Sequence, residues 1–554
     1  MGTTSAGLCP LLFSHLRLRH AFVCTFSVYD CTLNVRTVGF LADDERSFLS
    51  AVSQLAYCNP FLPERSEFER AALGRDYEEG EPVWSLPVEE PERPRANVWR
   101  IAGRLESLAA ELRQRLVAGP KATVPELVLY EDAVIHLLYN RFYQKFFESM
   151  ESVGKWGFYR DFVSDWRHFF GLESVALPTG HDPVHTFACF RQIQRAFEQI
   201  FRDIIGGSMP AAKLRAAIWQ SIFTHDMRRY RRTLYARMSD FATLVTGPSG
   251  SGKELVARAI AQSRYVPFDP NKLAFADEAV WFFPINISAL SPTLVESELF
   301  GHRRGAFTGA IGDRKGWLET CPQLGSVFLD ELGDMDPAIQ VKLLRVIETR
   351  TFHPVGDTVS RKFQGKLIAA TNRDLAADIR SGRFREDLYY RLCSDQIATP
   401  SLADQLADSP HVVRELVTYM ARRVAGAESE ELAGEVVQWI ERNLGPGYPW
   451  PGNYRELEQC VKNVLIRRDY RPVRPGVDPE EDFSAAFRAG RLTAEEMLSR
   501  YCGIVYGQTG SYEETARRLG IDRRTVKSKI AGRGPAPPRG PAPPRGPAPP
   551  RGPA

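Results

Sequence analysis

Apolar residues in the first 212 positions recur mainly at the spacing of helices. From residue 97 they stand three and four positions apart, as on one face of a helix: Val98, Ile101, Leu105, Leu108, Leu112 and Leu116. Two more helical patterns, rich in aromatic residues, cover residues 130–150 and 193–205. Residues 21–29 are β-branched and aromatic and predict a strand. We therefore expect a mainly helical (α or α+β) region over residues 1–212. Its aromatic residues favour a plain core over the lining of a ligand pocket.

The pattern changes after residue 212 to short apolar runs that end in polar residues or glycine. Runs with the length and character of buried strands are found at residues 242–245, 282–287, 326–329 and 367–370. They predict an α/β domain over residues 213–400. Helical patterns then cover residues 411–425 and 436–444 and begin again after Trp450, and they predict a helical lid over residues 401–468.

Prolines and repeats mark the limits of the C-terminal part. Several prolines among mixed charges indicate a linker, which we place at residues 469–491. Two short helical patterns meet at Gly520, so residues 492–531 predict a helix-turn-helix. From Arg533 the chain repeats Arg-Gly-Pro-Ala-Pro-Pro, and residues 532–554 are expected to be a disordered, proline-rich tail. The fold class is therefore multidomain.

The composition limits the classes of partner and compartment. The 554 residues carry a net charge of +3, so a nucleic-acid site would be a local patch and not a general field. The nine cysteines show no metal-binding spacing, which suits a reducing cytosol. The sequence contains no apolar run of bilayer length and no recognisable export signal. We expect a cytoplasmic protein without a membrane partner.

A glycine-rich turn ending in Gly-Lys stands between the first predicted strand and a predicted helix at residues 255–260. In this context the backbone N–H groups of the turn can face phosphate oxygens, and the lysine adds a positive charge. The residues predicted to bind a nucleotide are Gly247, Ser249, Gly250, Ser251, Gly252, Lys253 and Glu254. Glu254 is unusual, because most such loops carry Ser or Thr there. A turn without a ligand is the weaker alternative.

Two carboxylates, Asp330 and Glu331, directly follow the third apolar run. The carboxyl end of a parallel strand is where open α/β sheets place nucleotide chemistry. We expect Asp330 to hold Mg²⁺ and Glu331 to orient or polarise the attacking water. Asn372 ends the next run and could sense the γ-phosphate or hold a water molecule there. A plain surface Asp-Glu pair is disfavoured, because the strand before it is apolar.

Two other segments leave alternatives open. Arg385 and Arg391 could reach a transferred phosphate, often from another subunit, or form ordinary salt bridges. The residues between Gly305 and Ala310 place a Phe-Thr pair between glycines. That pair could form a hinged tip with an exposed aromatic side chain for a partner, or an ordinary hairpin turn.

Basic residues gather on the second helix of the predicted helix-turn-helix. The expected DNA-binding residues are Arg523, Arg524, Thr525, Lys527 and Lys529. A generic helical hairpin is the alternative, and the basic residues argue against it. Residues 227–238 carry five arginines, and for them a solvated helix face is favoured over contact with nucleic acid.

From about residue 214 to residue 468 the sequence strongly resembles the AAA+ domain of sigma-54-dependent transcriptional activators, the bacterial enhancer-binding proteins. The most specific element is the family's GAFTGA loop, which is reproduced in full by Gly305, Ala306, Phe307, Thr308, Gly309 and Ala310. The resemblance implies that Phe307 and Thr308 contact sigma-54. It also accounts for Glu254, because this family usually carries Glu at that position.

The same resemblance assigns further residues. Asp330 and Glu331 match the Walker B pair, and Asn286 matches the asparagine thought to switch the catalytic glutamate. Thr371 and Asn372 match sensor one, and Arg455 matches sensor two. Arg385 and Arg391 match the arginine fingers that act in trans. The C-terminal helices look like the family's Fis-type helix-turn-helix.

The implied function is an ATPase that activates transcription. It would form a homo-oligomeric ring, expected to be a hexamer, and bind upstream enhancer DNA. It would use ATP and Mg²⁺ to remodel the closed promoter complex of sigma-54 RNA polymerase. Two rivals remain: an AAA+ remodeller of another client, and a DNA-binding regulator without a working ATPase.

Three departures from the family pattern bear on regulation. The segment at residues 266–278 is longer than is usual in the family. Residues 398–410 lack the Leu-Arg-Glu-Arg pattern that is expected before the lid. Coupling of the lid is therefore open. The N-terminal region resembles no receiver or other common sensor, so the activating signal is open too.

Overall fold

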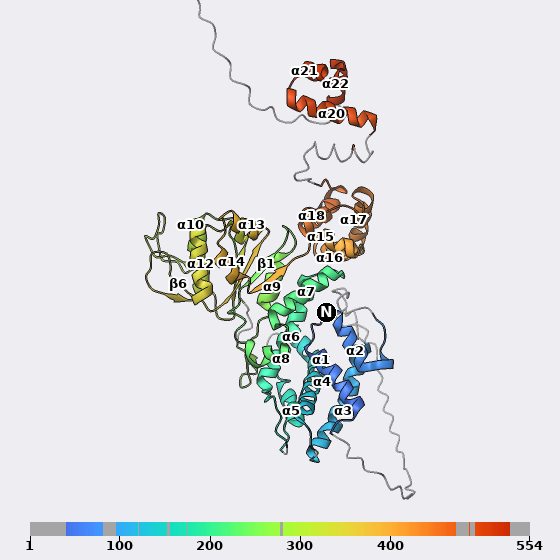
Figure 1. The fold of residues 1–554 in the computed structure, drawn as a ribbon, viewed down its shortest axis with the longest axis vertical. Coiled ribbons are helices and arrows are strands. Elements are labelled where there is room, and N and C mark those ends of the chain that lie inside the picture. The colour runs from blue at the N-terminus through green and yellow to red at the C-terminus, as the bar shows by residue number, and fades with distance from the viewer. Residues whose placement is uncertain are drawn as a thin grey trace, which may run out of the picture.

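Figure 1 shows the computed structural model of the chain, which describes residues 40–80, 96–119, 121–151, 156–173, 175–276, 281–472, 487 and 493–531. The strand predicted at residues 21–29 and the proline-rich tail lie outside the described residues. Most of the predicted linker at residues 469–491 lies outside them as well.

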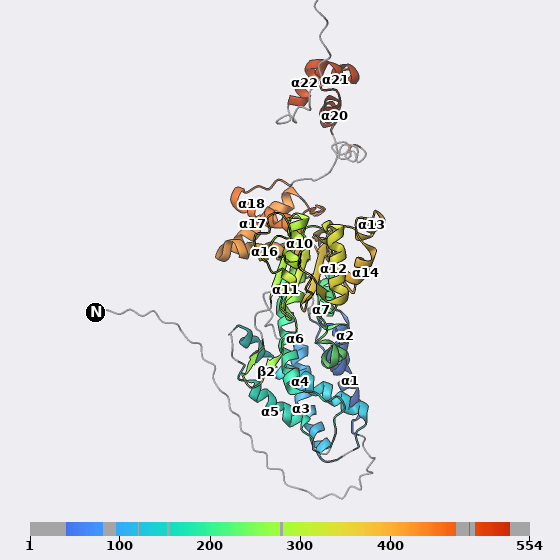
Figure 2. The same ribbon diagram turned by 90° about the vertical axis from the view of Figure 1, so that its left-hand side faces the viewer.

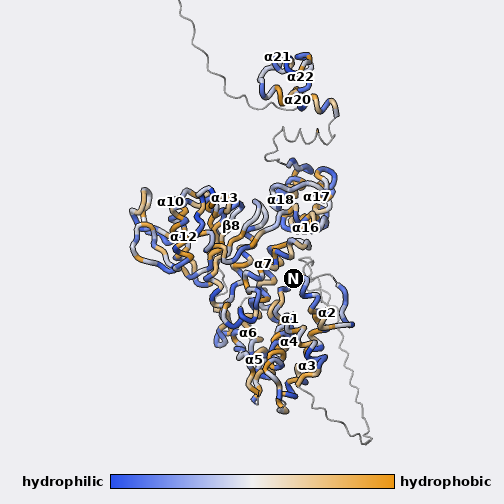
Figure 3. Tube along the Cα trace, viewed as in Figure 1, coloured by the Kyte–Doolittle hydropathy of each residue, from blue (hydrophilic) through white to orange (hydrophobic). Residues whose placement is uncertain are grey.

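The N-terminal region is helical, as its apolar spacing predicts. Its helices are α1 (Asp43–Tyr57), α2 (Glu64–Leu73), α3 (Ala96–Val117), α4 (Val124–Glu151), α5 (Tyr159–Phe170) and α6 (Pro183–Asp203), with a 3₁₀ turn at Gly74–Asp76. The predicted periodic face of α3 is buried from Ile101 to Leu116, and the aromatic residues Phe146, Phe162 and Phe187 are fully covered. The apolar stretches of these helices are the orange segments in Figure 3. The helices therefore pack around one shared core.

A second helical pair leads from this core to the sheet. Helix α7 (Met209–Phe223) is followed by α8 (Met227–Arg229) and a π-helical turn at Tyr230–Leu234. The predicted solvated face of residues 227–238 is only partly correct. Arg231 is buried, and Arg228 forms an ion pair with Asp132 of α4. Tertiary contacts with the N-terminal helices, which periodicity cannot reveal, account for the difference.

The middle of the chain forms a five-stranded parallel sheet in the order β4-β5-β8-β1-β9. Its strands are β1 (Thr243–Thr246), β4 (Phe282–Asn286), β5 (Ser326–Asp330), β8 (Lys366–Thr371) and β9 (Asp395–Ala398). The first four coincide with the predicted apolar runs. Strand β9 was not predicted, because its sequence Asp-Gln-Ile-Ala has a single large apolar residue, Ile397. The helices of this part are α9 (Lys253–Gln262), α10 (Pro292–Phe300), α11 (Trp317–Thr320), α12 (Pro337–Thr349), α13 (Leu375–Arg380) and α14 (Glu386–Leu392), with a 3₁₀ turn at Leu332–Asp334.

The unusually long segment after α9 folds as a two-stranded antiparallel hairpin, β2 (Phe268–Asp269) and β3 (Ala274–Phe275). Figure 2 shows it beside α5 and α6. Phe268 lies 4.8 Å from the ring of Tyr159 in α5 and 4.8 Å from that of Phe187 in α6. The hairpin therefore packs into the aromatic core of the N-terminal helices, although in sequence it lies between a helix and a strand of the sheet domain. A second small hairpin, β6 (Thr351–Phe352) and β7 (Arg361–Lys362), follows α12.

The remaining helices form two further groups. The predicted lid contains α15 (Leu402–Asp408), α16 (Val412–Ala425), α17 (Ser429–Asn443) and α18 (Asn453–Arg467), with a 3₁₀ turn at Gly426–Glu428. At the C-terminal end α20 (Ala494–Thr509), α21 (Tyr512–Leu519) and α22 (Arg523–Ala531) pack on one another. Gly520 ends α21 with a φ of 66°, as expected for the turn between two helices.

Candidate functional site

The glycine-rich turn joins the carboxyl end of β1 to the first residue of α9. Gly247, Gly250 and Gly252 have φ values of 146°, 74° and 88°, which side chains of L-residues rarely adopt. A Cβ at Gly250 would lie 2.4 Å from the carbonyl oxygen of Gly452, in the lid. Glycine at this position therefore allows the lid backbone to approach the turn.

Lys253 begins α9 and folds its side chain back over the turn. Its Nζ donates to the carbonyl oxygens of Gly247 and Pro248, each at 3.2 Å. Burial lowers the pKa of Lys253, and the carboxylates of Glu331 and Asp330 act in the opposite direction. The lysine and both acids predicted from sequence thus share one electrostatic site. The neighbouring Glu254 is exposed and pairs with Arg258 at 2.8 Å.

Asp330 is the last residue of β5, and Glu331 follows in the left-handed region with a φ of 54°. The N–H of Glu331 donates to Oδ1 of Asp330 at 3.0 Å. A non-glycine residue in this conformation costs about 1–3 kcal/mol, and such strain concentrates at functional sites. The bend turns the two carboxylates away from the regular alternation of a strand.

Two polar residues end the strands on either side of β5. Asn286 ends β4 and stands opposite Asp330 in the sheet register. Its Oδ1 accepts from Oγ of Ser288 at 2.8 Å and from the N–H of Ala289 at 3.2 Å. Thr371 ends β8 and is buried, whereas Asn372 beside it is exposed. The carboxyl edge of the sheet therefore brings together the predicted loop, acids and polar strand ends.

The lid is hydrogen-bonded to the glycine-rich turn. Nδ2 of Asn453 donates to the carbonyl oxygen of Ser249 at 2.9 Å. The N–H of Tyr454 donates to the carbonyl oxygen of Gly250 at 3.1 Å. Oδ1 of Asn453 accepts from the N–H of Leu402, at the start of α15, at 2.8 Å. Lid and turn thus touch although residues 398–410 lack the expected pattern.

Sequence reasoning missed two residues that shape this contact. Asn453, with a φ of 51°, bridges turn and lid, and the Gly452-Asn453 pair was the available signal for a special backbone there. Oγ1 of Thr399 lies 2.6 Å from Oγ of Ser251, and either hydroxyl can be the donor of this hydrogen bond. A Cβ at Gly247 would lie 2.0 Å from Oγ1 of Thr399. No local pattern in the sequence marks Thr399. Arg455, predicted to face the nucleotide, is exposed and lowers the pKa of Lys253 as a minor cause.

The two candidate finger arginines lie on the surface of this subunit. Arg385 caps α14 and forms two bonds to Asp387, at 3.0 and 2.6 Å. Arg391 pairs with Glu348 at 3.1 Å. All four side chains are substantially exposed, and such pairs contribute little to stability. Both arginines therefore remain available to another molecule.

The loop from Gly305 to Ala310 closes on itself through a 2.9 Å bond from the N–H of Gly305 to the carbonyl oxygen of Ala310. The two glycines have φ values of 82° and 100°. Of the two alternatives left open for this loop, Phe307 fits neither a fully exposed tip nor a buried core residue: it is half-buried, because its ring packs edge-on against His302 at 4.9 Å. Thr308 is exposed, and Ile311 directly after the loop is 87% exposed. The loop therefore presents Thr308 and an isoleucine that the sequence analysis did not single out.

The base of this loop is braced by charged pairs. Arg303 pairs with Asp313 at 2.6 Å and with Asp357, in the segment between β6 and β7, at 2.9 Å. The backbone of His302 forms an isolated β-bridge with Arg314 and another with Val355, which lies in the segment between β6 and β7. Two loops that extend from the sheet domain therefore support one another.

The predicted DNA-binding residues come together on α22, but not all are equally free. Arg523 pairs with Glu513 at 2.9 Å, and Lys529 reaches back to Glu495 of α20 at 2.7 Å. Arg524 and Lys527 are exposed, and Thr525 is half-buried. The exposed side of α22 therefore has Arg524 and Lys527 as its freest cations.

Across the described residues, no three His, Cys, Asp or Glu side chains are grouped in a way that could hold a metal ion. The described helices also include none that is both long and apolar enough to cross a bilayer.

Comparison with known proteins identifies the sheet domain. Residues 223–398, from the end of α7 to the end of β9, match the family model of the Sigma-54 interaction domain. This part of the chain is a sigma-54 interaction domain. The resemblance derived from the GAFTGA loop is thereby confirmed. The sigma-54 interaction domain holds the glycine-rich turn, both acids and the loop, whereas the lid follows it.

Two relatives show how far the sequence similarity extends. The transcriptional regulatory protein ZraR of Klebsiella oxytoca is 37% identical over 300 residues, 53% of this chain and 64% of that protein. The Nif-specific regulatory protein of Azotobacter vinelandii is 40% identical over 296 residues, 52% of this chain and 53% of that protein. The chain thus spans less than two thirds of the length of either relative. The crystal structure of NtrX from Brucella abortus in complex with ATP aligns with 67% of this chain and 79% of that chain, with 22% identity and a TM-score of 0.36.

Proposed function

We propose that this protein is an ATP-dependent activator of transcription that remodels the closed promoter complex of sigma-54 RNA polymerase. The observation that carries the proposal is the match of residues 223–398 to the sigma-54 interaction domain, in which one fold holds both the glycine-rich turn and the Gly305–Ala310 loop. The relatives named above are regulatory proteins.

The residues around the turn fit a nucleoside triphosphate with Mg²⁺. The three positive-φ glycines give the turn a backbone conformation that residues with side chains rarely adopt, and the side chain of Lys253 lies across it. Asp330 supplies a carboxylate that is coupled electrostatically to this lysine. When bound, Mg²⁺ would neutralise phosphate charge, and Asp330 would hold it. Hard carboxylate oxygens are the donors that Mg²⁺ prefers.

Each remaining residue takes one role in hydrolysis. Glu331, bent into the left-handed region, orients the attacking water as a general base. Asn286 stands opposite Asp330 in the register and acts on the position of Glu331. Thr371 and Asn372 report the γ-phosphate state from the end of β8, and Arg455 does so from the lid.

The exposed arginines suit a site shared between subunits. Arg385 and Arg391 have only surface carboxylates as partners, so they can exchange these for a phosphate on a neighbouring copy. The active form is therefore a homo-oligomeric ring, for which a hexamer is expected. Nucleotide state is transmitted to Thr308, Phe307 and the rest of the Gly305–Ala310 loop, which contacts sigma-54.

The chain around this domain supplies tethering and control. Helices α20–α22 form a Fis-type helix-turn-helix in which Arg523, Arg524, Thr525, Lys527 and Lys529 bind upstream enhancer DNA in the cytoplasm. Tethering raises the effective concentration of the ring at its promoter. The domain boundaries expected from sequence, with regulation over residues 1–212 and a lid over residues 401–468, complete the proposal.

A reconstituted transcription reaction tests it. Purified protein, sigma-54 polymerase, ATP and a supercoiled sigma-54 promoter should give transcripts that Lys253→Ala abolishes. Polymerase with a different sigma factor should not respond. Transcription that Lys253→Ala leaves intact would support the rival regulator without an ATPase. ATP hydrolysis without transcripts would support a remodeller of another client.

A further inference from the structure

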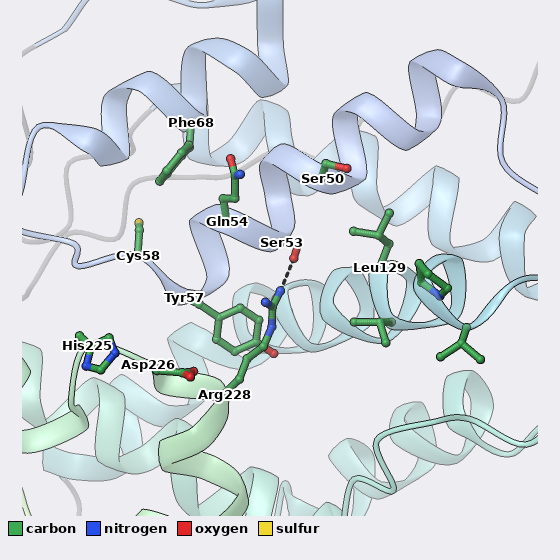
Figure 4. Close-up of a pocket in the computed structure, with 13 residues that line it drawn as sticks. Ser50, Ser53, Gln54, Tyr57, Cys58, Phe68, Leu129, His225, Asp226 and Arg228 are labelled. Atoms are coloured by element: carbon green, nitrogen blue, oxygen red, sulfur yellow. Dashed lines mark hydrogen bonds between the residues drawn. The ribbon is translucent and has the colours of Figure 1, made fainter.

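An open cleft of about 890 Å³ lies where the N-terminal helices meet the segment that leads to the sigma-54 interaction domain (Figure 4). Helices α1, α2 and α4 form its sides, and residues 225–228 form one end. The volume falls within the range of about 300–1,000 Å³ that is usual for small-molecule sites. The role proposed above for the chain does not use this cleft.

The sides of the cleft are mainly apolar. Phe68 of α2 faces it from one side, and Val124, Val128 and Leu129 of α4 line the other. Val124 is 63% exposed. These walls suit the hydrocarbon part of a molecule.

One end of the cleft carries a cation with spare hydrogen-bonding capacity. Nη2 of Arg228 donates to Oδ2 of Asp132 at 2.6 Å and to Oγ of Ser53, and the guanidinium lies 4.3 Å from the ring centre of Tyr57. Both of these bonds use Nη2, and the side chain of Tyr57 interacts with the guanidinium as well. The side chain of Arg228 is 45% exposed, whereas that of Asp132 is 3% exposed. A guanidinium with a free edge favours an anionic group that can accept two bonds.

We propose that this cleft binds an amphipathic organic anion, whose hydrocarbon part lies along α4 and whose carboxylate or sulfonate meets the free edge of Arg228. The exposed imidazole of His225 stands at the same end and can donate to the same group. Asp226 also lines this end, but its carboxylate lies 3.7 Å from the guanidinium of Arg229, which offsets its charge. The apolar trough and the donors of Arg228 and His225 define this ligand class and disfavour sugars or nucleotides.

The position of Arg228 links this site to control of the ATPase. Arg228 belongs to α8, between α7 and the turn that enters β1, whereas Asp132 belongs to α4. An anion on Arg228 shares the guanidinium with Asp132. It therefore weakens a polar tie between the N-terminal helices and the segment entering the sheet. This inference stands whether or not the client of the ATPase is sigma-54.

Two fluorescent probes with related ring systems test the site on the full chain. 8-Anilinonaphthalene-1-sulfonate carries the anion, and N-phenyl-1-naphthylamine is its uncharged counterpart. The sulfonate should bind saturably and at least about tenfold more tightly than the neutral probe, as a charge-assisted hydrogen bond predicts. Val128→Trp fills the trough and should weaken both probes by about tenfold or more. Val117→Trp, at an exposed position in the same helical region, is the matched control and should change neither.

Asp132→Asn separates this account from general surface binding. The asparagine keeps an oxygen for the hydroxyl of Tyr57 and places its NH2 group in place of Oδ2, where it can donate to Ser53 but cannot accept from Arg228. The competing charge is removed, so the sulfonate should bind several-fold more tightly and the neutral probe should be unaffected. Thermal unfolding of each variant shows that it is folded. The proposal is overturned if Val128→Trp leaves sulfonate binding unchanged. It is equally overturned if Asp132→Asn shifts both probes alike or weakens the sulfonate.

Discussion

The hairpin after α9 should be essential for joining the sigma-54 interaction domain to the N-terminal helices. Phe275 of this hairpin is 6% exposed, and its ring lies 4.8 Å from that of Trp156 and 4.9 Å from that of Phe268. The guanidinium of Arg191 sits 4.0 Å from the same ring. Truncation of a buried phenylalanine to alanine costs about 3–5 kcal/mol. Loss of the cation–π contact adds about 1 kcal/mol.

Phe275→Ala should therefore lower the free energy of unfolding of this unit by about 4–6 kcal/mol. Urea denaturation followed by tryptophan emission and by circular dichroism measures the change. In the wild type the two probes should report one coincident transition, because the hairpin carries residues of one part into the core of the other. In Phe275→Ala the N-terminal helices should unfold first. Phe241→Ala, at a residue 42% exposed, is the control and should cost no more than about 0.5 kcal/mol. A loss below about 1 kcal/mol for Phe275→Ala would refute the reasoning.

Three further changes have defined outcomes. Gly250→Ala places a Cβ 2.4 Å from the carbonyl oxygen of Gly452, and calorimetric titration should show ATP affinity reduced by about tenfold or more; unchanged affinity would show that lid and turn are not in contact. Arg385→Ala should bind ATP without hydrolysing it, and mixing it with Lys253→Ala subunits should restore phosphate release; no restoration in the mixture would exclude action in trans. Burial lowers the pKa of His136 from 6.5 to about 4, so stability should be full above pH 6.5 and fall as the pH drops towards 4. His136→Gln should flatten that part of the urea-midpoint profile, and an unaltered profile would assign the loss to other groups.

Sequence patterns predicted the elements whose signal is local. Four strands of the sheet were predicted because each is a run of apolar residues, and α3 because its buried residues keep helical spacing. The fifth strand, β9, is short and mostly polar, so its place beside β1 depends on the assembled sheet. Helix α15 was missed for a similar reason, since its seven residues include only two leucines.

The residues of the candidate site also fall into two groups, those with a local sequence signal and those without one. Lys253, Asp330 and Glu331 were predicted because their spacing from strand ends is a local property. Thr399 and Asn453 could not be, because their roles arise from contacts across more than 50 positions of chain. The longer segment at residues 266–278 was recognised as unusual. Its sequence gave no means to predict that Phe268 and Phe275 would enter the core of another part.

The most direct test of the central claim is a measurement of promoter opening per ATP hydrolysed, in purified closed complexes of sigma-54 polymerase. Opening is followed by the fluorescence of a 2-aminopurine base in the melted region, and hydrolysis by phosphate release. Thr308 is exposed on the Gly305–Ala310 loop, away from the nucleotide turn in sequence, so Thr308→Ala should hydrolyse ATP at a near-normal rate and open no promoter. Normal opening by Thr308→Ala, or no opening by the wild type during hydrolysis, would contradict the account.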